Sequence, residues 1–170
     1  MRDQGFTLIE ILIVLVVISI VTTLALVNLR ANQNRKLENF TNELSQLLSL
    51  VEEQALLRPG VLAVKFDKDS YQFFSYKSDA KLEKKESLWR LLDDDDLLLE
   101  HKIPYDISLR IVTGDDDKDV TEEETVTPQI VFSTNGDVSP FAIYVGAPDK
   151  DPVYVVRGEA DGTIKAKKLS

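Results

Sequence analysis

The sequence predicts an α+β protein in which one long N-terminal helix precedes a head of antiparallel β-sheets. Two observations predict this architecture. Residues 6–57 carry first a continuous apolar run and then apolar residues at helical spacing, and Pro59-Gly60 ends them. Beyond residue 60, short β-rich runs alternate with turn signals. We therefore expect the helix and the sheets to pack around a shared core.

Composition restricts the classes of function. The chain has 170 residues, 44% of them hydrophobic, and a net charge of −9. Charges within residues 1–30 cancel, so the whole negative charge lies in residues 31–170, which disfavours binding to nucleic acid or anionic lipid. The absence of cysteine excludes disulfides and thiolate sites.

The first element is an apolar run from Ile11 to Leu29. At ~1.5 Å per residue it reaches roughly 28 Å, which is about the hydrocarbon thickness of a bilayer. The remaining residues are too few to bury a helix that is apolar on all faces. The run therefore predicts membrane insertion. Only four polar residues interrupt it: Ser19, Thr22, Thr23 and Asn28.

Glu10 stands at the edge of this run, where a carboxylate in lipid costs ~2.5–3.5 kcal/mol. A cut between Gly5 and Phe6 would create an α-amino group four residues before Glu10. Ammonium and carboxylate could then neutralise each other, within one chain or between neighbours. The alternative is a plain membrane anchor with a chance acidic residue.

The stretch GFTLIE followed by an apolar run resembles the class III signal of type IV pilins and type II secretion pseudopilins. The resemblance implies a removable leader, residues 1–5, that a prepilin peptidase cuts after Gly5. It implies that Phe6 becomes the methylated N-terminus and that Glu10 is needed for methylation and assembly. Many major pilins have proline or glycine inside this span. Because Ile11 to Leu29 has neither, a continuous helix and a minor subunit are favoured.

The helix is predicted to continue to about Leu57. We expect residues 6–30 to form its transmembrane and assembly half. Residues 31–170 would form a head, with an amphipathic helix over 31–57 and a β-rich region over 61–170. The apolar face predicted for this part of the helix comprises Leu37, Phe40, Leu44, Leu47, Val51 and Ala55.

The β-rich region contains three turn signals: Asp67–Ser70, Asn135-Gly136 and Gly158–Gly162. A short helix near Leu88 to Leu92 is the one helical segment that the pattern allows after residue 60. The predicted strands are Val61–Phe66, Tyr71–Tyr76, Ile103–Val112, Ile130–Ser133, Phe141–Val145, Val153–Arg157 and Thr163–Lys168.

Two acidic stretches, Asp93–Asp96 and Gly114–Glu124, are predicted to be solvated, mobile surface loops. Carboxylates could hold calcium, but the spacing is not that of an EF-hand loop, so no metal is expected. The candidate ligands for such a site are Asp115, Asp116, Asp117 and Asp119.

The sequence gives little support to an enzymatic or a DNA-binding function. His101 is the only histidine, and no nucleophile, P-loop or metal-ligand motif accompanies it, so an exposed, non-catalytic histidine is expected and no cofactor. A basic strip of Lys165, Lys167 and Lys168 is a weak electrostatic footprint on an acidic body. Neither an enzyme nor a nucleic-acid partner is therefore expected.

The segment PQIVFSTNGDVSPFAIYV and the final DGTIKA resemble the head of H-type minor pseudopilins of type II secretion, the GspH/FimT-like family. This resemblance implies a pilin-like fold with two antiparallel sheets. The matching positions are Phe132, Gly136, Ser139, Pro140 and Phe141.

The resemblance also implies a function. Such a subunit is structural, has a single-pass anchor in the bacterial inner membrane and holds its head in the periplasm. It links the pseudopilus tip, formed by the minor I, J and K subunits, to the major G-type shaft, and the secreted substrate is a further partner. The alternative is a FimU- or FimT-like minor pilin of a type IV pilus, acting in assembly or DNA uptake.

Overall fold

The computed structural model describes residues 7–58, 60–76, 89–92, 98–114, 116–119 and 128–169, with the backbone alone for residues 24–31 and 116–119. The chain divides into two compact units, Met1–Lys36 and Leu37–Ser170. The predicted leader, residues 1–5, and Phe6 lie outside the described residues.

One helix, α1, runs from Leu8 to Leu57 and contributes to both units. In the second unit its buried face follows the predicted spacing with one change. Leu48 is fully buried, whereas Leu47 is only partly buried against the core. Leu48, and not Leu47 as predicted, therefore occupies this position on the buried face. The reason is geometric, since a step of four from Leu44 to Leu48 keeps a side chain on one helix face.

The first sheet, sheet A, has the strand order β3-β2-β1-β7, and β4 pairs with β2. All pairs given for it are antiparallel. Its strands are β1 (Leu62–Phe66), β2 (Ser70–Tyr76), β3 (Trp89–Leu91), β4 (His101–Lys102) and β7 (Ile130–Phe132).

The second sheet, sheet B, has the order β10-β9-β8-β5-β6 and is also antiparallel. Its strands are β5 (Ser108–Thr113), β6 (Asp116–Asp119), β8 (Phe141–Gly146), β9 (Tyr154–Gly158) and β10 (Ile164–Lys168).

Three sequence predictions in the middle of the chain are wrong. The short helix near Leu88 to Leu92 is instead β3, whose pairing with β2 satisfies its backbone. The strand predicted from Ile103 begins only at Ser108, because the chain turns at Pro104, where the Ile107 N–H donates to the Pro104 carbonyl.

The third concerns the acidic stretch 114–124. Residues 116–119 form β6, paired with β5, and are not a free loop. Here backbone pairing with a neighbouring strand overrides the composition of the segment. Asp93–Asp96, Asp115 and residues 120–124 lie outside the described residues.

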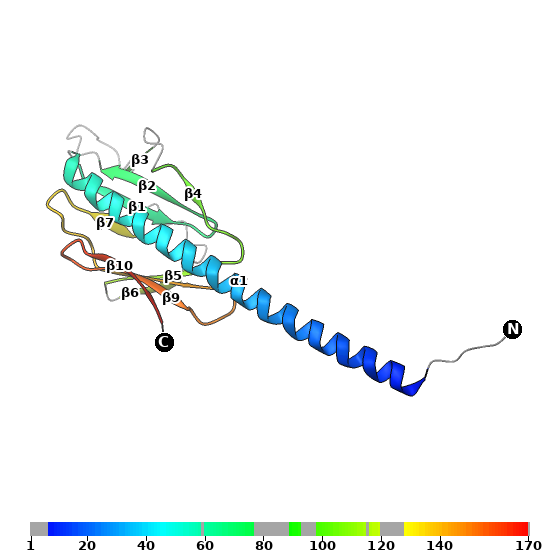
Figure 1. Cartoon of the computed structure of the whole chain (residues 1–170). Helices are drawn as coiled ribbons and strands as arrows, with labels where there is room; N and C mark the ends of the chain where they lie inside the picture. Colours follow the sequence, from blue (N-terminus) through cyan, green and yellow to red (C-terminus); the bar gives the residue numbers. More distant parts are fainter. Residues whose placement is uncertain are drawn as a thin grey trace. The chain divides into compact units, whose positions relative to one another are not determined.

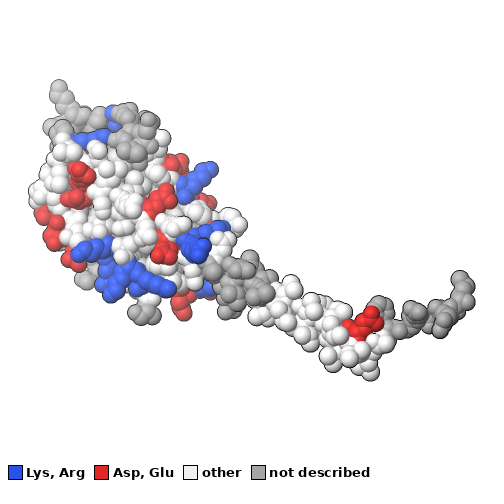
Figure 2. All heavy atoms as spheres, in the orientation of Figure 1, with Lys and Arg blue, Asp and Glu red and all other residues white. Residues whose placement is uncertain are grey.

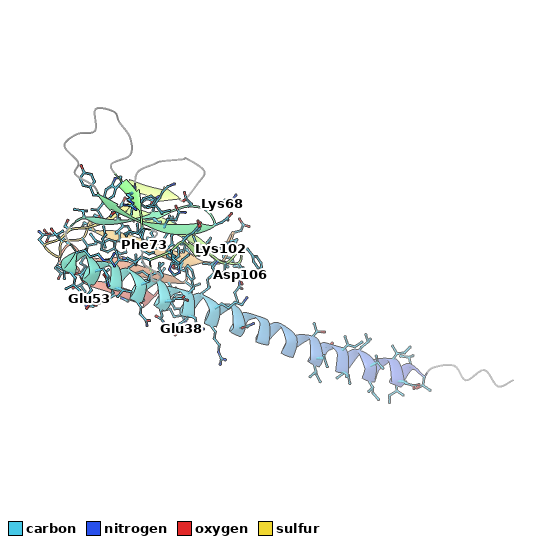
Figure 3. The ribbon with its side chains drawn as sticks, turned by 90° about the horizontal axis from the view of Figure 1, so that it is seen from above. Glu38, Glu53, Lys68, Phe73, Lys102 and Asp106 are labelled. Atoms are coloured by element: carbon cyan, nitrogen blue, oxygen red, sulfur yellow. The ribbon has the colours of Figure 1, made fainter. Side chains whose placement is uncertain are left out.

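The core of the second unit draws side chains from α1 and from both sheets, and α1 runs across them (Figure 1). Its largest fully buried side chains are Phe66, Phe73, Phe132, Leu44, Leu48, Leu98, Ile130 and Ile143. Figure 3 shows Phe73 inside the head, and Glu38 and Glu53 along α1. The predicted α+β architecture is confirmed: a long N-terminal helix accompanies antiparallel sheets.

Candidate assembly surface

The N-terminal turn of α1 positions Glu10. The Glu10 and Ile11 N–H groups donate to the Thr7 carbonyl at 3.1 and 3.3 Å, which makes Thr7 the residue that precedes the helix. Glu10 lies in the first turn, where the positive end of the helix dipole favours a carboxylate. Thr7 and Glu10 also have the T-x-x-E spacing of a capping box. The described part of the chain thus presents an exposed carboxylate beside the start of an apolar helix.

Large apolar side chains cover every side of the following helical turns. Each is at least 50% exposed, a level that a helix in water normally shows only for isolated residues. We call residues 8–21 the apolar segment. Its exposed members are Leu8, Ile9, Ile11, Leu12, Ile13, Val14, Leu15, Val16, Val17, Ile18, Ile20 and Val21.

Hydroxyl groups in and beside the apolar segment are satisfied within the helix. Ser19, Thr22 and Thr23 donate to the carbonyls four residues earlier, at 2.8 Å each. Such bonds remove the need for water at these groups. The surface of the segment therefore behaves as apolar despite its hydroxyls, and in Figure 2 it is largely uncharged.

Within the residues that the structure describes, no helix has both the length and the apolarity needed to cross a membrane. Gly5 and Phe6 lie outside the described residues, so the structure places only Glu10.

The head motif predicted from sequence forms one structural unit. The Ser139 hydroxyl accepts a hydrogen bond from the Val131 N–H, and the Ser139 N–H donates to the Val131 carbonyl, both at 2.9 Å. This pair ties the segment before β8 to β7. Phe132 and Phe141, on either side, are buried in the same core.

Two glycine turns meet Glu52 of α1. Gly136 and Gly162 have φ of +87° and +84°, a region that favours glycine. A Cβ at Gly162 would lie 2.8 Å from the Gly136 carbonyl oxygen and 3.0 Å from the Glu52 carboxylate. The two turns and Glu52 thus approach one another closely, and the sequence signal for Gly136 was its Asn-Gly dipeptide.

His101 is not the exposed histidine that the sequence predicted. It is partly buried on β4 and stacks on Tyr71, with ring centroids 5.2 Å apart and planes 7° apart. Burial, and secondarily the Glu43 carboxylate, raises the pKa of Tyr71. Sequence reasoning missed this aromatic cluster because Tyr71 and His101 come from strands far apart in the chain. Among the residues described, no cluster of His, Cys, Asp and Glu could hold a metal ion.

Comparison with known proteins agrees with this picture. Residues 1–26 match the family model described as the prokaryotic N-terminal methylation motif. The chain is 24% identical to "Type II secretion system protein H" of Aeromonas hydrophila, over 94% of this chain and 90% of that protein. It is 25% identical to the protein of the same name from Pseudomonas aeruginosa, over 83% of this chain and 81% of that protein.

Solved structures share the fold. The minor pseudopilin EpsH from the type 2 secretion system of Vibrio cholerae matches with a TM-score of 0.61 and 20% identity, covering 76% of this chain and 94% of that one. The solution structure of E. coli GspH matches with a TM-score of 0.57 and 12% identity, covering 81% and 89%.

The long N-terminal helix and the two-sheet head define a protein with a pilin-like fold, whose residues 1–26 match the N-terminal methylation motif. Among such proteins, the resemblance predicted from the sequence is confirmed: the relatives and the fold support an H-type minor pseudopilin of type II secretion.

Proposed function

We propose that this chain is made as a prepilin, cut after Gly5 and methylated at Phe6. The match over residues 1–26 supports this, since that family is described by its N-terminal methylation. Glu10 then pairs with an α-amino group at Phe6, in the same or a neighbouring chain. When the pair forms between neighbouring chains, it fixes the position of each chain relative to the next along the axis of the assembly. The charge pair also lowers the cost of placing either group in an apolar environment.

The observation that carries the proposal is the exposure of the apolar segment on all sides. Its side chains need an apolar environment, because exposed apolar area of this extent is unfavourable in water. We infer two successive environments: the bacterial inner membrane as a single-pass anchor over residues 6–30, and then a bundle of like helices in the pseudopilus. The head, residues 31–170, lies in the periplasm.

In the assembled pseudopilus we propose that the subunit links the tip, formed by the minor I, J and K subunits, to the shaft of major G-type subunits. Its contribution is packing and not catalysis. The similarity to proteins named as type II secretion components supports this role. The head presents its loops to these partners or to the secreted substrate.

Mass spectrometry of the protein isolated from its native membrane tests the processing step. The expected mature chain begins at methylated Phe6, and Gly5→Ala leaves the leader attached. A mature chain that begins at Met1 would overturn the proposal.

Assembly is tested separately with Glu10→Ala, compared with Ile9→Ala as a control that changes an apolar neighbour. Glu10→Ala is expected to insert in the membrane but to fail to enter the pseudopilus, while Ile9→Ala enters it. Normal incorporation of Glu10→Ala would show that the carboxylate is dispensable.

Partner identity separates the secretion role from a type IV pilus role. The detergent-solubilised full chain is expected to recover other secretion pseudopilins in a pull-down. Recovery of pilus-assembly proteins without secretion pseudopilins would instead favour the minor pilin function.

A further inference from the structure

Strand β10 ends sheet B and offers a backbone edge. The register pairs Lys165 with Arg157 and Lys167 with Val155. At one end of this ladder the Glu159 N–H donates to the Thr163 carbonyl. At the other end the Leu169 N–H donates to the Val153 carbonyl. Because bonded pairs alternate in an antiparallel ladder, the Lys165 and Lys167 backbones face β9. The backbone groups of three residues therefore face away from the sheet: Ile164, Ala166 and Lys168.

Cationic side chains line the outer face of the same edge. Lys165 and Lys167 are exposed and lie on one face of β10, because side chains alternate along a strand. Arg157 is directly opposite Lys165 and is also exposed. We call Arg157, Lys165 and Lys167 the basic strip. It faces away from the core, because Tyr154 and Val156 occupy the alternate, inward positions of β9.

The charges in this part of the head are unevenly distributed. Figure 2 shows Lys and Arg side chains gathered over β9 and β10, on a protein whose net charge is −9. The nearby carboxylate of Asp161 has a pKa lowered first by its hydrogen bonds with Thr163, with a smaller contribution from Lys165.

Protection of the sheet edge against pairing with unwanted strands does not explain every residue of the basic strip. Lysines on β10 alone would deter pairing with unwanted strands. Arg157 lies on the inner strand β9, where it adds no protection to the edge. Directly opposite like charges destabilise a sheet, so the Arg157–Lys165 pair is costly for folding alone. An anionic partner would turn this repulsion into attraction.

We propose that β10 and the basic strip bind an extended acidic polypeptide segment by strand addition. The segment's backbone bonds to the outward groups of Ile164, Ala166 and Lys168. Every second side chain then lies on the outer face beside Lys165 and Lys167, so carboxylates at alternate positions meet the strip.

The observations favour a polypeptide over nucleic acid or an anionic membrane. Only a polypeptide uses the outer edge of β10, which no described strand pairs with, through main-chain hydrogen bonds. The acidic remainder of the head repels a long polyanion, whereas a short segment contacts the strip alone.

A synthetic peptide of about eight residues, a usual strand length, tests the proposal. It alternates Glu and Thr, its control alternates Gln and Thr, and both are titrated against the full chain in neutral detergent by fluorescence anisotropy. The acidic peptide is expected to bind at least tenfold more tightly than the control. Its affinity should fall as salt rises from about 50 to 200 mM, because salt screens exposed charges.

Two pairs of variants separate the charges from the backbone edge. Lys165→Glu with Lys167→Glu should weaken binding at least tenfold, while Lys168→Glu, on the opposite face of β10, should change it far less. Ala166→Pro removes an outward N–H and should abolish binding, while Ala166→Ser should retain it. Thermal unfolding of each variant checks that the head remains folded.

Several outcomes would overturn the proposal. These are equal affinity for the two peptides, a folded Ala166→Pro variant that binds normally, and loss of binding in Lys168→Glu as large as in the Lys165 and Lys167 variant. Preference for duplex DNA or phosphatidylglycerol vesicles over the acidic peptide would assign the strip to those ligands. Self-association of the chain that Ala166→Pro abolishes would assign the edge to a second copy.

Discussion

The ring of Phe141 fills the space in which a side chain at Gly158 would have to lie. The two residues are direct partners in the β8–β9 register, and a Cβ on Gly158 would be 2.1 Å from Cε1 of Phe141. An aromatic ring across from a strand glycine covers backbone that would otherwise be left unpacked. Phe141 is only 5% exposed, so the ring has little room to move aside.

Gly158→Ala is therefore expected to lower the free energy of unfolding by about 1 to 3 kcal/mol, as overpacking of a core does. Urea denaturation of the full chain in neutral detergent measures it, with Glu159→Ala on the same hairpin as the control. The double variant, Gly158→Ala with Phe141→Leu, should lose less stability than the sum of the losses in the two single variants. Strict additivity would mean that the ring does not obstruct the new methyl group.

Ser139→Ala removes the acceptor of the Val131 N–H, a 2.9 Å hydrogen bond in a partly buried place. An N–H left without its partner costs about 1 to 2 kcal/mol of stability. Ser139→Thr retains the hydroxyl and should recover most of that loss. Denaturant midpoints of the two variants, with exposed Thr134→Ala as the control, test this. If Ser139→Thr is as unstable as Ser139→Ala, the loss of stability comes from packing and not from the hydrogen bond.

The register of α1 on the core is tested by two neighbouring leucines. Leu48→Ala empties a fully buried position and should cost about 2 to 5 kcal/mol. Leu47→Ala removes a partly buried side chain and should cost about 1 kcal/mol. Equal losses in denaturation experiments would contradict the orientation of the helix described above.

Stability at alkaline pH should depend on Tyr71. Its pKa is raised above the ordinary value of 10.0, first by burial and then by Glu43. Above pH 10 the unfolded chain releases this proton while the folded chain keeps it, so stability is present below pH 10 and falls as pH rises further.

Each such group contributes a slope of up to ~1.4 kcal/mol per pH unit. Tyr71→Phe should make the fall above pH 10 less steep. Tyr105→Phe, at a residue 94% exposed, is the control for the loss of a tyrosine hydroxyl from the surface. Part of the fall should persist in Tyr71→Phe, because burial, and then Glu38, also raises the pKa of Tyr154. Identical slopes for the wild type and Tyr71→Phe would show that Tyr71 ionises as freely in the folded head as in the unfolded chain.

Much of the fold was predictable because its signals are local. Helical spacing placed Leu44, Val51 and Ala55 on the buried face, and the Asn135-Gly136 dipeptide marked a turn between strands. Predictions failed where pairing partners were distant in sequence. Residues 116–119 become a strand through pairing with β5, which their acidic composition did not indicate.

The candidate site shows the same division. The N-terminal motif with Glu10 was readable because its chemistry requires particular residues at adjacent positions, and the match over residues 1–26 agrees with it. The stack of His101 on Tyr71 was not readable, because strands β4 and β2 bring together residues thirty positions apart.

By itself, the sequence determined the class of fold, the apolar segment and the motif that precedes it, because period and composition are properties of neighbouring residues. Only the tertiary structure decided that Phe141 covers Gly158 and that Arg157 faces Lys165 beside β10, the last of the described strands of sheet B. The physical reason is that strand register, which depends on packing of whole sheets against α1, sets which distant side chains meet.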